Sequence, residues 1–178
     1  IDKIINPTLQ GLKDLGIEYR GFLYTGLMIK NDEPYLIEYN VRMGDPECQT
    51  ILPKLKTDLL DILLSCCNKK LDEIDIQWNK KKSISIIISS KGKTNEFKKN
   101  LIIENINKVK TDQNNFCFHA GTVSKNNKIL AVGGRVLNLV SMADNFTTAR
   151  KDIIKNIEIL NWTDGFYRKD IGYKVIKE

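Results

Sequence analysis

The sequence has no long apolar run and no secretory signal. No stretch approaches the roughly 18 uninterrupted apolar residues of a membrane-spanning helix, and residues 1–5 lack the form of a signal peptide. We therefore expect a cytoplasmic protein with no membrane partner. Because the first residue is Ile rather than Met, and residues 4–15 already have helical spacing, we expect the chain to be part of a longer protein.

Cysteine and histidine are scarce. No C-x-x-C pair occurs among the four cysteines, Cys48, Cys66, Cys67 and Cys117, and a zinc site needs closer ligand spacing than theirs. We expect buried or partly buried reduced thiols instead. His119 is the single histidine, and its strand-like surroundings favour a packed or hydrogen-bonded role near the domain junction over a catalytic one.

The lysine-rich stretches contain no interleaved aromatic residues. Lys and Arg together number 28 against 22 Asp and Glu, a net charge of +6, and much of the excess lies in runs such as 80–82 and 98–99. Such runs usually form solvated surface, whereas binding of single-stranded nucleic acid uses aromatic side chains on which bases stack. We expect no nucleic-acid partner, and a basic polyanion-binding module without catalytic activity remains an alternative function.

The first part of the sequence predicts a helix, a hairpin and a second helix. Residues 4–15 have apolar side chains at helical spacing, and Gly16 is placed to end that helix. Strand-like runs at 19–29 and 34–41 flank a short polar turn, which predicts a β-hairpin. Thr57-Asp58 then leads into residues 59–64, which predict a helix of core-facing character.

The second part predicts more strands, with a boundary in the polar stretch 72–82. We divide the chain into domains at 1–79 and 80–178. Residues 83–89 predict a strand, and residues 116–123 and 129–137 a hairpin around Asn126-Asn127. Ser141 to Asp144 has the form of a capping box that opens a helix. We expect the aromatic tail that carries Trp162, Phe166 and Tyr167 to pack against that helix.

Polar residues alternate along the second predicted strand. Alternation places Leu36, Glu38, Asn40 and Arg42 on one side of it. The oxygen atoms of Glu38 and Asn40 can coordinate a hard cation such as Mg²⁺, and the Arg42 guanidinium can stabilise charge on a transferring phosphoryl group. An ordinary solvent-exposed strand face is the competing interpretation of this pattern.

A turn rich in carboxylates follows this strand. Gly44-Asp45-Pro46-Glu47 places Asp45 and Glu47 on a loop, where substrates are commonly held. Negative charge at this position suits a substrate that carries an amine. The turn thus favours the functional interpretation of the preceding strand.

Five motifs, in this order, resemble those of phosphoribosylamine–glycine ligases. The family is a branch of the ATP-grasp enzymes, and the similarity spans nearly the whole chain. The motifs lie at residues 24–28, 37–49, 119–122, 133–137 and 166–172. The resemblance implies an α+β fold, with the closing part of an ATP-grasp lobe (antiparallel sheet with helices) followed by a small sheet-and-helix carboxy-terminal domain.

The resemblance also implies an activity. It predicts ligation of glycine to 5-phosphoribosylamine, driven by conversion of ATP to ADP and phosphate through a glycyl phosphate intermediate. Glu38 and Asn40 match the family's ligands for Mg²⁺ (or Mn²⁺), and Arg42 the residue expected to contact phosphates at the reacting centre. The nucleotide-binding half is not visible, so we expect this part alone to be inactive. Another ATP-grasp ligase with a different amine or acid substrate is the nearest alternative.

Two further sets of residues carry over by motif. Asp45 and Glu47 match the substrate-binding turn, without individual roles. Gly134 and Arg135 match the place where the last domain closes over the site. For Arg135 there are two interpretations: a contact with a phosphate or carboxylate group, or a surface arginine that bonds a strand end.

One segment departs from the family pattern. Lys91-Gly92-Lys93-Thr94 stands where the family usually has a Gly-Tyr-Pro turn. It is not a P-loop, because Ile87 occupies the position of the first glycine that this motif requires.

Overall fold

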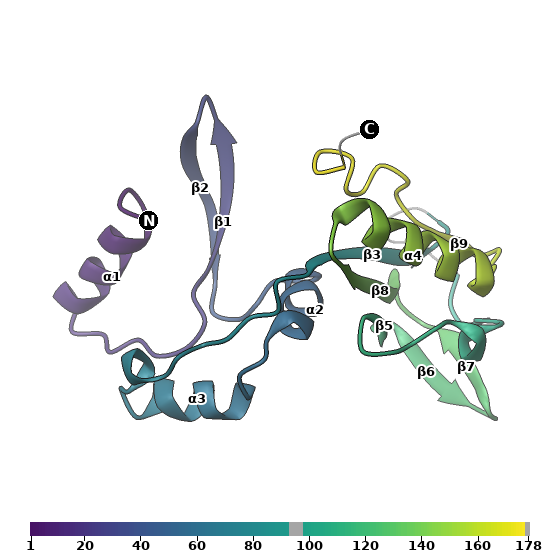
Figure 1. Cartoon of the computed structure of the whole chain (residues 1–178), viewed down its shortest axis with the longest axis horizontal. Coiled ribbons are helices and arrows are strands. Elements are labelled where there is room, and N and C mark those ends of the chain that lie inside the picture. Colours follow the sequence, from purple (N-terminus) through teal and green to yellow (C-terminus); the bar gives the residue numbers. More distant parts are fainter. Residues whose placement is uncertain (93–97, 177–178) are drawn as a thin grey trace. The chain divides into compact units, whose positions relative to one another are not determined.

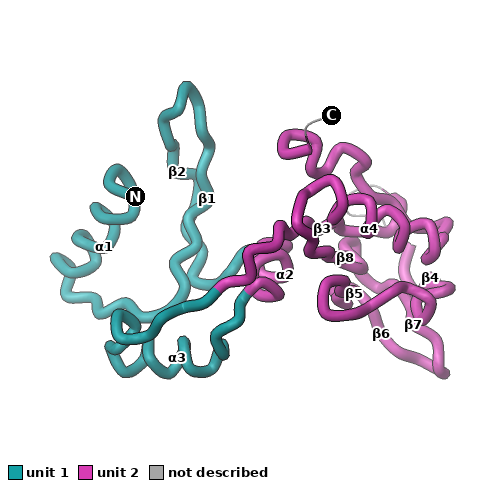
Figure 2. The backbone as a smooth tube through the Cα atoms, viewed as in Figure 1, with its two compact units in different colours: residues 1–45, 55–77 teal, residues 46–54, 78–178 magenta. Residues whose placement is uncertain are grey.

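The computed structural model describes residues 1–92 and 98–176, so Lys93 and Thr94 of the departing segment lie outside the described residues. The chain forms two compact units, which are described separately (Figure 2). The first unit contains residues 1–45 and 55–77, and the second contains residues 46–54 and 78–178. No described helix is long and apolar enough to cross a membrane.

The first unit opens with the predicted helix, α1 (Ile5–Asp14). It ends at Gly16, whose positive φ of 70° an L side chain rarely adopts. The Gly16 amide donates to the Lys13 carbonyl at 2.9 Å, and the Ile17 amide donates to the Leu12 carbonyl at 2.9 Å. These two bonds form a Schellman motif, which confirms the predicted helix end.

The predicted hairpin is β1 (Tyr24–Lys30) and β2 (Glu33–Asn40), which pair antiparallel (Figure 1). Asn31 and Asp32 connect them, with φ values of 52° and 60°. Two successive left-handed residues form a turn whose twist matches the strands. The first strand begins at Tyr24, later than predicted, and Gly21 at φ 137° lies in the preceding irregular segment.

A β-bulge changes the side-chain pattern of β2. Glu38 lies opposite Gly26, but Leu36 lies opposite Leu27. Residues that pair across two strands lie on the same face of the sheet, whereas adjacent residues such as Gly26 and Leu27 point to opposite faces. Their partners Glu38 and Leu36 therefore also lie on opposite faces, and Ile37 is the extra residue of the bulge. The prediction that Leu36 and Glu38 share a face is therefore wrong, because strict alternation holds only in a regular ladder.

The second helix of the first unit, α3 (Leu59–Cys67), begins as predicted. The Asp58 side chain accepts a hydrogen bond from the Leu60 amide at 2.7 Å and so caps the helix. A single 3₁₀ turn, η2 (Leu71–Glu73), follows. The predicted core-facing character is wrong for this chain, because no residue of α3 is buried and Leu60 is 61% exposed.

The first unit as a whole lacks a core. None of its hydrophobic side chains is buried, although α1, both hairpin strands and α3 carry them. Ile37, for example, is 65% exposed, and Met28 and Ile29 are each 59% exposed. Its apolar faces are therefore uncovered.

The second unit is built on two antiparallel sheets (Figure 1). The four-stranded sheet has the order β5-β8-β3-β9 and the three-stranded sheet the order β4-β7-β6. The strands of the first sheet are β3 (Lys82–Ser90), β5 (Asn115–His119), β8 (Arg135–Ala143) and β9 (Gly165–Phe166). Those of the second are β4 (Leu101–Ile102), β6 (Thr122–Lys125) and β7 (Lys128–Ala131), and a 3₁₀ turn, η3 (Ile106–Lys108), follows β4.

The predicted second hairpin is confirmed, but it is bent so that it contributes to both sheets. Asn126 and Asn127 form its turn with φ values of 51° and 58°. At the bend, the Gly121 amide donates to the Arg135 carbonyl at 3.0 Å, and the Val132 amide donates to the Gly121 carbonyl at 2.8 Å. A Cβ on Gly121 would lie 2.5 Å from the Arg135 carbonyl oxygen, so only glycine fits this crossing of two backbones.

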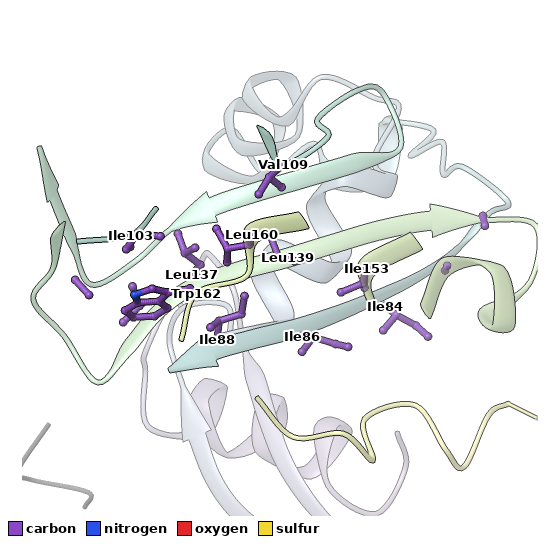
Figure 3. Packing of buried hydrophobic residues seen from close by; sticks show 14 residues of the cluster. Ile84, Ile86, Ile88, Ile103, Val109, Leu137, Leu139, Ile153, Leu160 and Trp162 are labelled. Carbon is purple, nitrogen blue, oxygen red and sulfur yellow. The ribbon is translucent and has the colours of Figure 1, made fainter. Parts of the chain in front are cut away.

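Helix α4 (Phe146–Leu160) packs on the four-stranded sheet and completes the core. Figure 3 shows Ile84, Ile86 and Ile88 in a row along β3, and all three are at most 6% exposed. Their burial pattern alternates along the strand, as expected when one face lies on the core. From α4, Ile153 is 1% exposed within the same cluster.

The cap of α4 differs from the prediction. Ser141 lies inside β8, where it is fully buried, and the helix instead begins after Asn145. The Asn145 side chain accepts a hydrogen bond from the Thr148 amide at 2.8 Å. The predicted capping box is wrong because pairing with β3 and β5 extends β8 through Ala143.

The aromatic tail is anchored mainly by Trp162. Trp162 is 9% exposed in the core cluster, Tyr167 packs against that cluster, and Phe166 is 55% exposed. Arg150 of α4 holds the following segment by donating from Nε to the Ile171 carbonyl at 3.0 Å. Packing of the tail is thus confirmed for Trp162 and Tyr167 and is wrong for Phe166.

A carboxylate stabilises the turn before β5. Asp112 Oδ1 accepts hydrogen bonds from the amides of Asn114 at 2.8 Å and Asn115 at 2.9 Å. Hydrogen bonds hold the pKa of Asp112 well below its ordinary value of 3.8. The largest effect comes from the Asn114 amide, followed by the side chains of Lys110 and Asn115. The ionised carboxylate therefore stabilises the fold fully above about pH 3.8, the pKa in the unfolded chain. This contribution is lost as the pH falls from there toward the lower pKa of the folded state.

Asp112→Ala should lower the free energy of unfolding at neutral pH, and its difference from the unchanged protein should shrink in acid. The reason is that acid protonates this carboxyl group in the unfolded state first, which progressively removes the stabilisation that the ionised native carboxylate provides. Urea unfolding from neutral pH to about pH 3 would measure this trend. Glu104→Ala, which removes an exposed acid in the same unit, serves as the control. A difference that grows with acid would contradict the assignment.

Candidate functional site

Glu38 and Asn40 form the clearest polar pair of the predicted site. Both lie near the end of β2, and Asn40 Nδ2 donates to Glu38 Oε1 at 3.0 Å. Glu38 lies opposite Gly26 in the ladder, and a Cβ on Gly26 would lie 3.0 Å from Glu38 Cγ. The absence of a side chain on Gly26 therefore leaves room for the Glu38 side chain.

This pair has the chemistry that a hard cation requires. This hydrogen bond directs the side-chain nitrogen of Asn40, Nδ2, toward Glu38. Asn40 Oδ1 and the second carboxylate oxygen of Glu38 are then the oxygen ligands available to Mg²⁺ or Mn²⁺. Among the residues that the structure describes, no group of three or more His, Cys, Asp or Glu side chains is placed to hold a metal ion. The pair thus fits a site of two protein ligands, with water or phosphate oxygens completing the shell.

Arg42 does not continue the row on the strand. β2 ends at Asn40, and the chain bends at Val41 and Arg42. Arg42 is exposed, and its Nη1 donates to the Met43 carbonyl at 3.1 Å. The predicted placement of Arg42 on the strand face is therefore wrong, because the ladder that sets the alternation has already ended.

The carboxylate turn lies where the chain passes between the two units. Asp45 is the last residue of the first segment of the first unit, and Pro46 is the first residue assigned to the second unit. Glu47 opens the short helix α2 (Glu47–Ile51), which leads into a 3₁₀ turn, η1 (Leu52–Lys54). Asp45 is exposed and Glu47 is half-buried.

Gly134 and Arg135 lie at the start of β8. The Gly134 carbonyl accepts a hydrogen bond from the Ser90 amide at 2.9 Å, which ties this loop to the end of β3. Arg135 is exposed and lies opposite Ser89 at a register shift in the β3–β8 ladder. Irregular pairing of this kind changes the direction of the side chains beside it.

The bent hairpin brings two of the sequence motifs together. Residues 119–122 and 133–137 meet at the glycine crossing, where the Ala120 amide also donates to the Val136 carbonyl at 3.0 Å. His119 is exposed, and its Nδ1 is 2.9 Å from Thr122 Oγ1. The prediction of a hydrogen-bonded histidine is confirmed, although the ring is not packed.

The cysteines are free thiols in the structure. Burial raises the pKa of the Cys117 thiol to about 11, so this residue is un-ionised at neutral pH. Cys48 and Cys66 are also partly buried, as predicted, whereas Cys67 is exposed at the end of α3.

Sequence reasoning missed Thr50 and Ser85, whose hydroxyl groups lie 2.9 Å apart and form a hydrogen bond. Thr50 lies in α2, and Ser85 lies in β3. The spacing of Thr50 four residues after Pro46 was the available signal, because Thr at that spacing can bond back to a carbonyl. No pattern in the sequence indicated its partner in β3.

Comparison with known proteins gives two family matches. Residues 1–48 match the family described as phosphoribosylglycinamide synthetase, ATP-grasp (A) domain. This match identifies the first part of the chain as a portion of an ATP-grasp domain. Residues 83–174 match the family described as phosphoribosylglycinamide synthetase, C domain. The chain therefore belongs to the phosphoribosylglycinamide synthetase family.

Curated relatives agree with this assignment. The chain is 41% identical over 171 residues to a phosphoribosylamine–glycine ligase of Caldanaerobacter subterraneus, covering 96% of this chain and 40% of the relative. It is 38% identical over 176 residues to the trifunctional purine biosynthetic protein adenosine-3 of Gallus gallus, covering 98% of this chain and 17% of that protein.

A solved structure shares the fold. The crystal structure of a phosphoribosylamine–glycine ligase from Thermotoga maritima matches with a TM-score of 0.80 at 27% identity, over 96% of this chain and 42% of that one. The chain thus spans about two-fifths of the length of the Caldanaerobacter and Thermotoga ligases.

Proposed function

We propose that this chain is part of an enzyme that joins glycine to 5-phosphoribosylamine and converts ATP to ADP and phosphate. The product would be glycinamide ribonucleotide, formed through a glycyl phosphate intermediate in purine synthesis. The observation that carries the proposal is the presence of both family domains in one chain, in the order ATP-grasp domain then C domain. A cytoplasmic setting completes the proposal.

The residues of the first unit would serve the phosphates. Glu38 and Asn40 would bind Mg²⁺ or Mn²⁺, because their oxygen atoms are neighbours on one strand and suit a hard cation. The metal would neutralise charge on the phosphates of ATP. Arg42, exposed beyond the strand end, would stabilise charge on the transferring phosphoryl group.

Other predicted residues would bind substrates. Asp45 and Glu47 would contact an amine-bearing substrate through their carboxylates. Arg135, with Gly134 beside it, would contact a phosphate or carboxylate group. These roles follow from the motifs and from the exposure of Asp45 and Arg135.

The domain boundary near residues 79 and 80 remains our proposal for the division between the two family domains. The uncovered apolar faces of the first unit support a further part of this proposal. We expect them to pack against the part of the enzyme that lies outside the matched two-fifths of the relatives, and we expect this chain alone to be inactive.

The direct test is release of ADP by the full-length protein that contains this sequence. With ATP, Mg²⁺ and freshly made phosphoribosylamine, ADP should form only when glycine is added. Replacing glycine by other small amino acids tests the alternative of a ligase with a different acid substrate. ADP release that is independent of glycine, or faster with another acid, would overturn the proposed reaction.

A further inference from the structure

We propose that Thr50 and Ser85 are positioning residues that fix the turn carrying Glu47 against the sheet of the second unit. Both residues lie outside the predicted binding and metal residues. This inference rests on the proposed function, in which Glu47 contacts an amine-bearing substrate. All the contacts that support it lie within the second unit.

Helix α2 has little stability of its own. It is only five residues long, none of them is fully buried, and no side chain caps its first turn. Isolated helices shorter than about 12 residues are marginal in water, because the first turn costs more conformational entropy than its bonds return. The position of Glu47 therefore depends on contacts between α2 and the rest of the second unit.

Thr50 supplies such a contact, because its hydroxyl group connects the Pro46 carbonyl of the turn with Ser85 of β3. Its backbone amide donates to the Pro46 carbonyl at 3.1 Å, and its hydroxyl donates to the same carbonyl at 2.8 Å. The hydroxyl is also hydrogen-bonded to the Ser85 hydroxyl at 2.9 Å. The Pro46 carbonyl belongs to the peptide bond that joins Pro46 to Glu47, so these bonds fix the backbone where the Glu47 side chain begins.

Ser85 is a rigid anchor. It lies in the middle of β3, which pairs with β8 along most of its length. The neighbouring residues Ile84 and Ile86 are 6% and 1% exposed in the core, so the backbone on either side of Ser85 is held by packing. A hydrogen bond from this strand therefore transmits a fixed position to α2.

Loss of this anchor should loosen the turn without unfolding the unit. Thr50→Val removes the hydroxyl and keeps the side-chain shape, and Ser85→Ala removes the partner hydroxyl. In the full-length protein, hydrogen exchange in a peptide covering residues 46–54 should become about fivefold faster in either variant, equivalent to one net hydrogen bond. Thr50→Ser, which keeps the hydroxyl, should restore the original rate.

Ser83→Ala is the matched control. Ser83 lies on the same strand and the same face as Ser85, and its hydroxyl has no hydrogen-bond partner among the described residues. Its removal should leave exchange in residues 46–54 unchanged. Unchanged exchange in Thr50→Val, or equal acceleration in Ser83→Ala, would overturn the anchor.

Steady-state kinetics test whether the anchor serves the substrate. Thr50→Val should raise the KM of glycine or of phosphoribosylamine about tenfold or more, with the KM of ATP unchanged, since small misplacements of a binding group cost up to about 100-fold. Unchanged KM values for both amines would overturn the positioning role. If the unchanged enzyme itself released no glycine-dependent ADP, the proposed function would fail, while the exchange rates would still decide whether the hydroxyl pair fixes the turn.

Discussion

Glu38→Gln should reduce kcat/KM of the full-length enzyme by about 1,000-fold, which corresponds to about 4 kcal/mol of lost transition-state stabilisation. The substitution keeps the size of the side chain and one oxygen atom, but it removes the negative charge that would hold the metal. Because Asn40 donates to Glu38 across the strand face, the pair would also lose its charge-assisted hydrogen bond. Glycine-dependent ADP release at increasing Mg²⁺ concentrations is the measurement.

Glu33→Gln makes the same chemical change at the start of the same strand. Glu33 forms an exposed ion pair with Lys3, and such pairs contribute little to stability. The Glu33→Gln variant should therefore be as active as the unchanged enzyme. Circular dichroism should show the same fold for Glu33→Gln and Glu38→Gln. Full activity of Glu38→Gln would remove Glu38 from the metal site.

Gly121→Ala should lower the free energy of unfolding of the second unit by about 3 kcal/mol, at the upper end for overpacked sites. The new methyl group would lie 2.5 Å from the Arg135 carbonyl oxygen and 2.7 Å from Gly133 Cα. Both neighbours are backbone atoms, so no side chain can rotate away. Hydrogen bonds to Gly121 from Val132 and to Arg135 from Gly121 oppose a shift of either strand.

Urea unfolding followed by tryptophan fluorescence measures this effect, since Trp162 lies in the core of the second unit. Gly11→Ala is the matched control, because an added Cβ at Gly11 meets no atom within 4 Å. Alanine in that helix should be neutral or stabilising by up to about 1 kcal/mol. A midpoint for Gly121→Ala equal to that of Gly11→Ala would show that the crossing relaxes without cost.

Local sequence features predicted much of the fold because they act within a few residues. Gly16 ends α1 by adopting a left-handed conformation, and the Asn-Asn pair at 126–127 forms a turn in the same way. The capping box at Ser141 failed because burial between two neighbouring strands outweighed a local preference. The prediction that Leu36 lies on the same face as Glu38 was wrong for a related reason, since a β-bulge depends on the register with the partner strand.

The candidate site was predictable only where alternation holds. Glu38 and Asn40 are neighbours because the ladder is regular between them, whereas the end of the ladder could not be located from the polar residues around Arg42. The hydroxyl pair of Thr50 and Ser85 joins residues far apart in the sequence. Contacts of that kind come from the tertiary fold and leave no local pattern.

The path of the chain between the units limits how the two domains can be exchanged among relatives. Residues 46–54 precede the last segment of the first unit, yet they pack on β3 and β8 of the second. A chimera joined near residue 80 would therefore combine α2 from one parent with a sheet from another. Recombination would preserve the hydroxyl pair only if both parents carried compatible residues at positions 50 and 85.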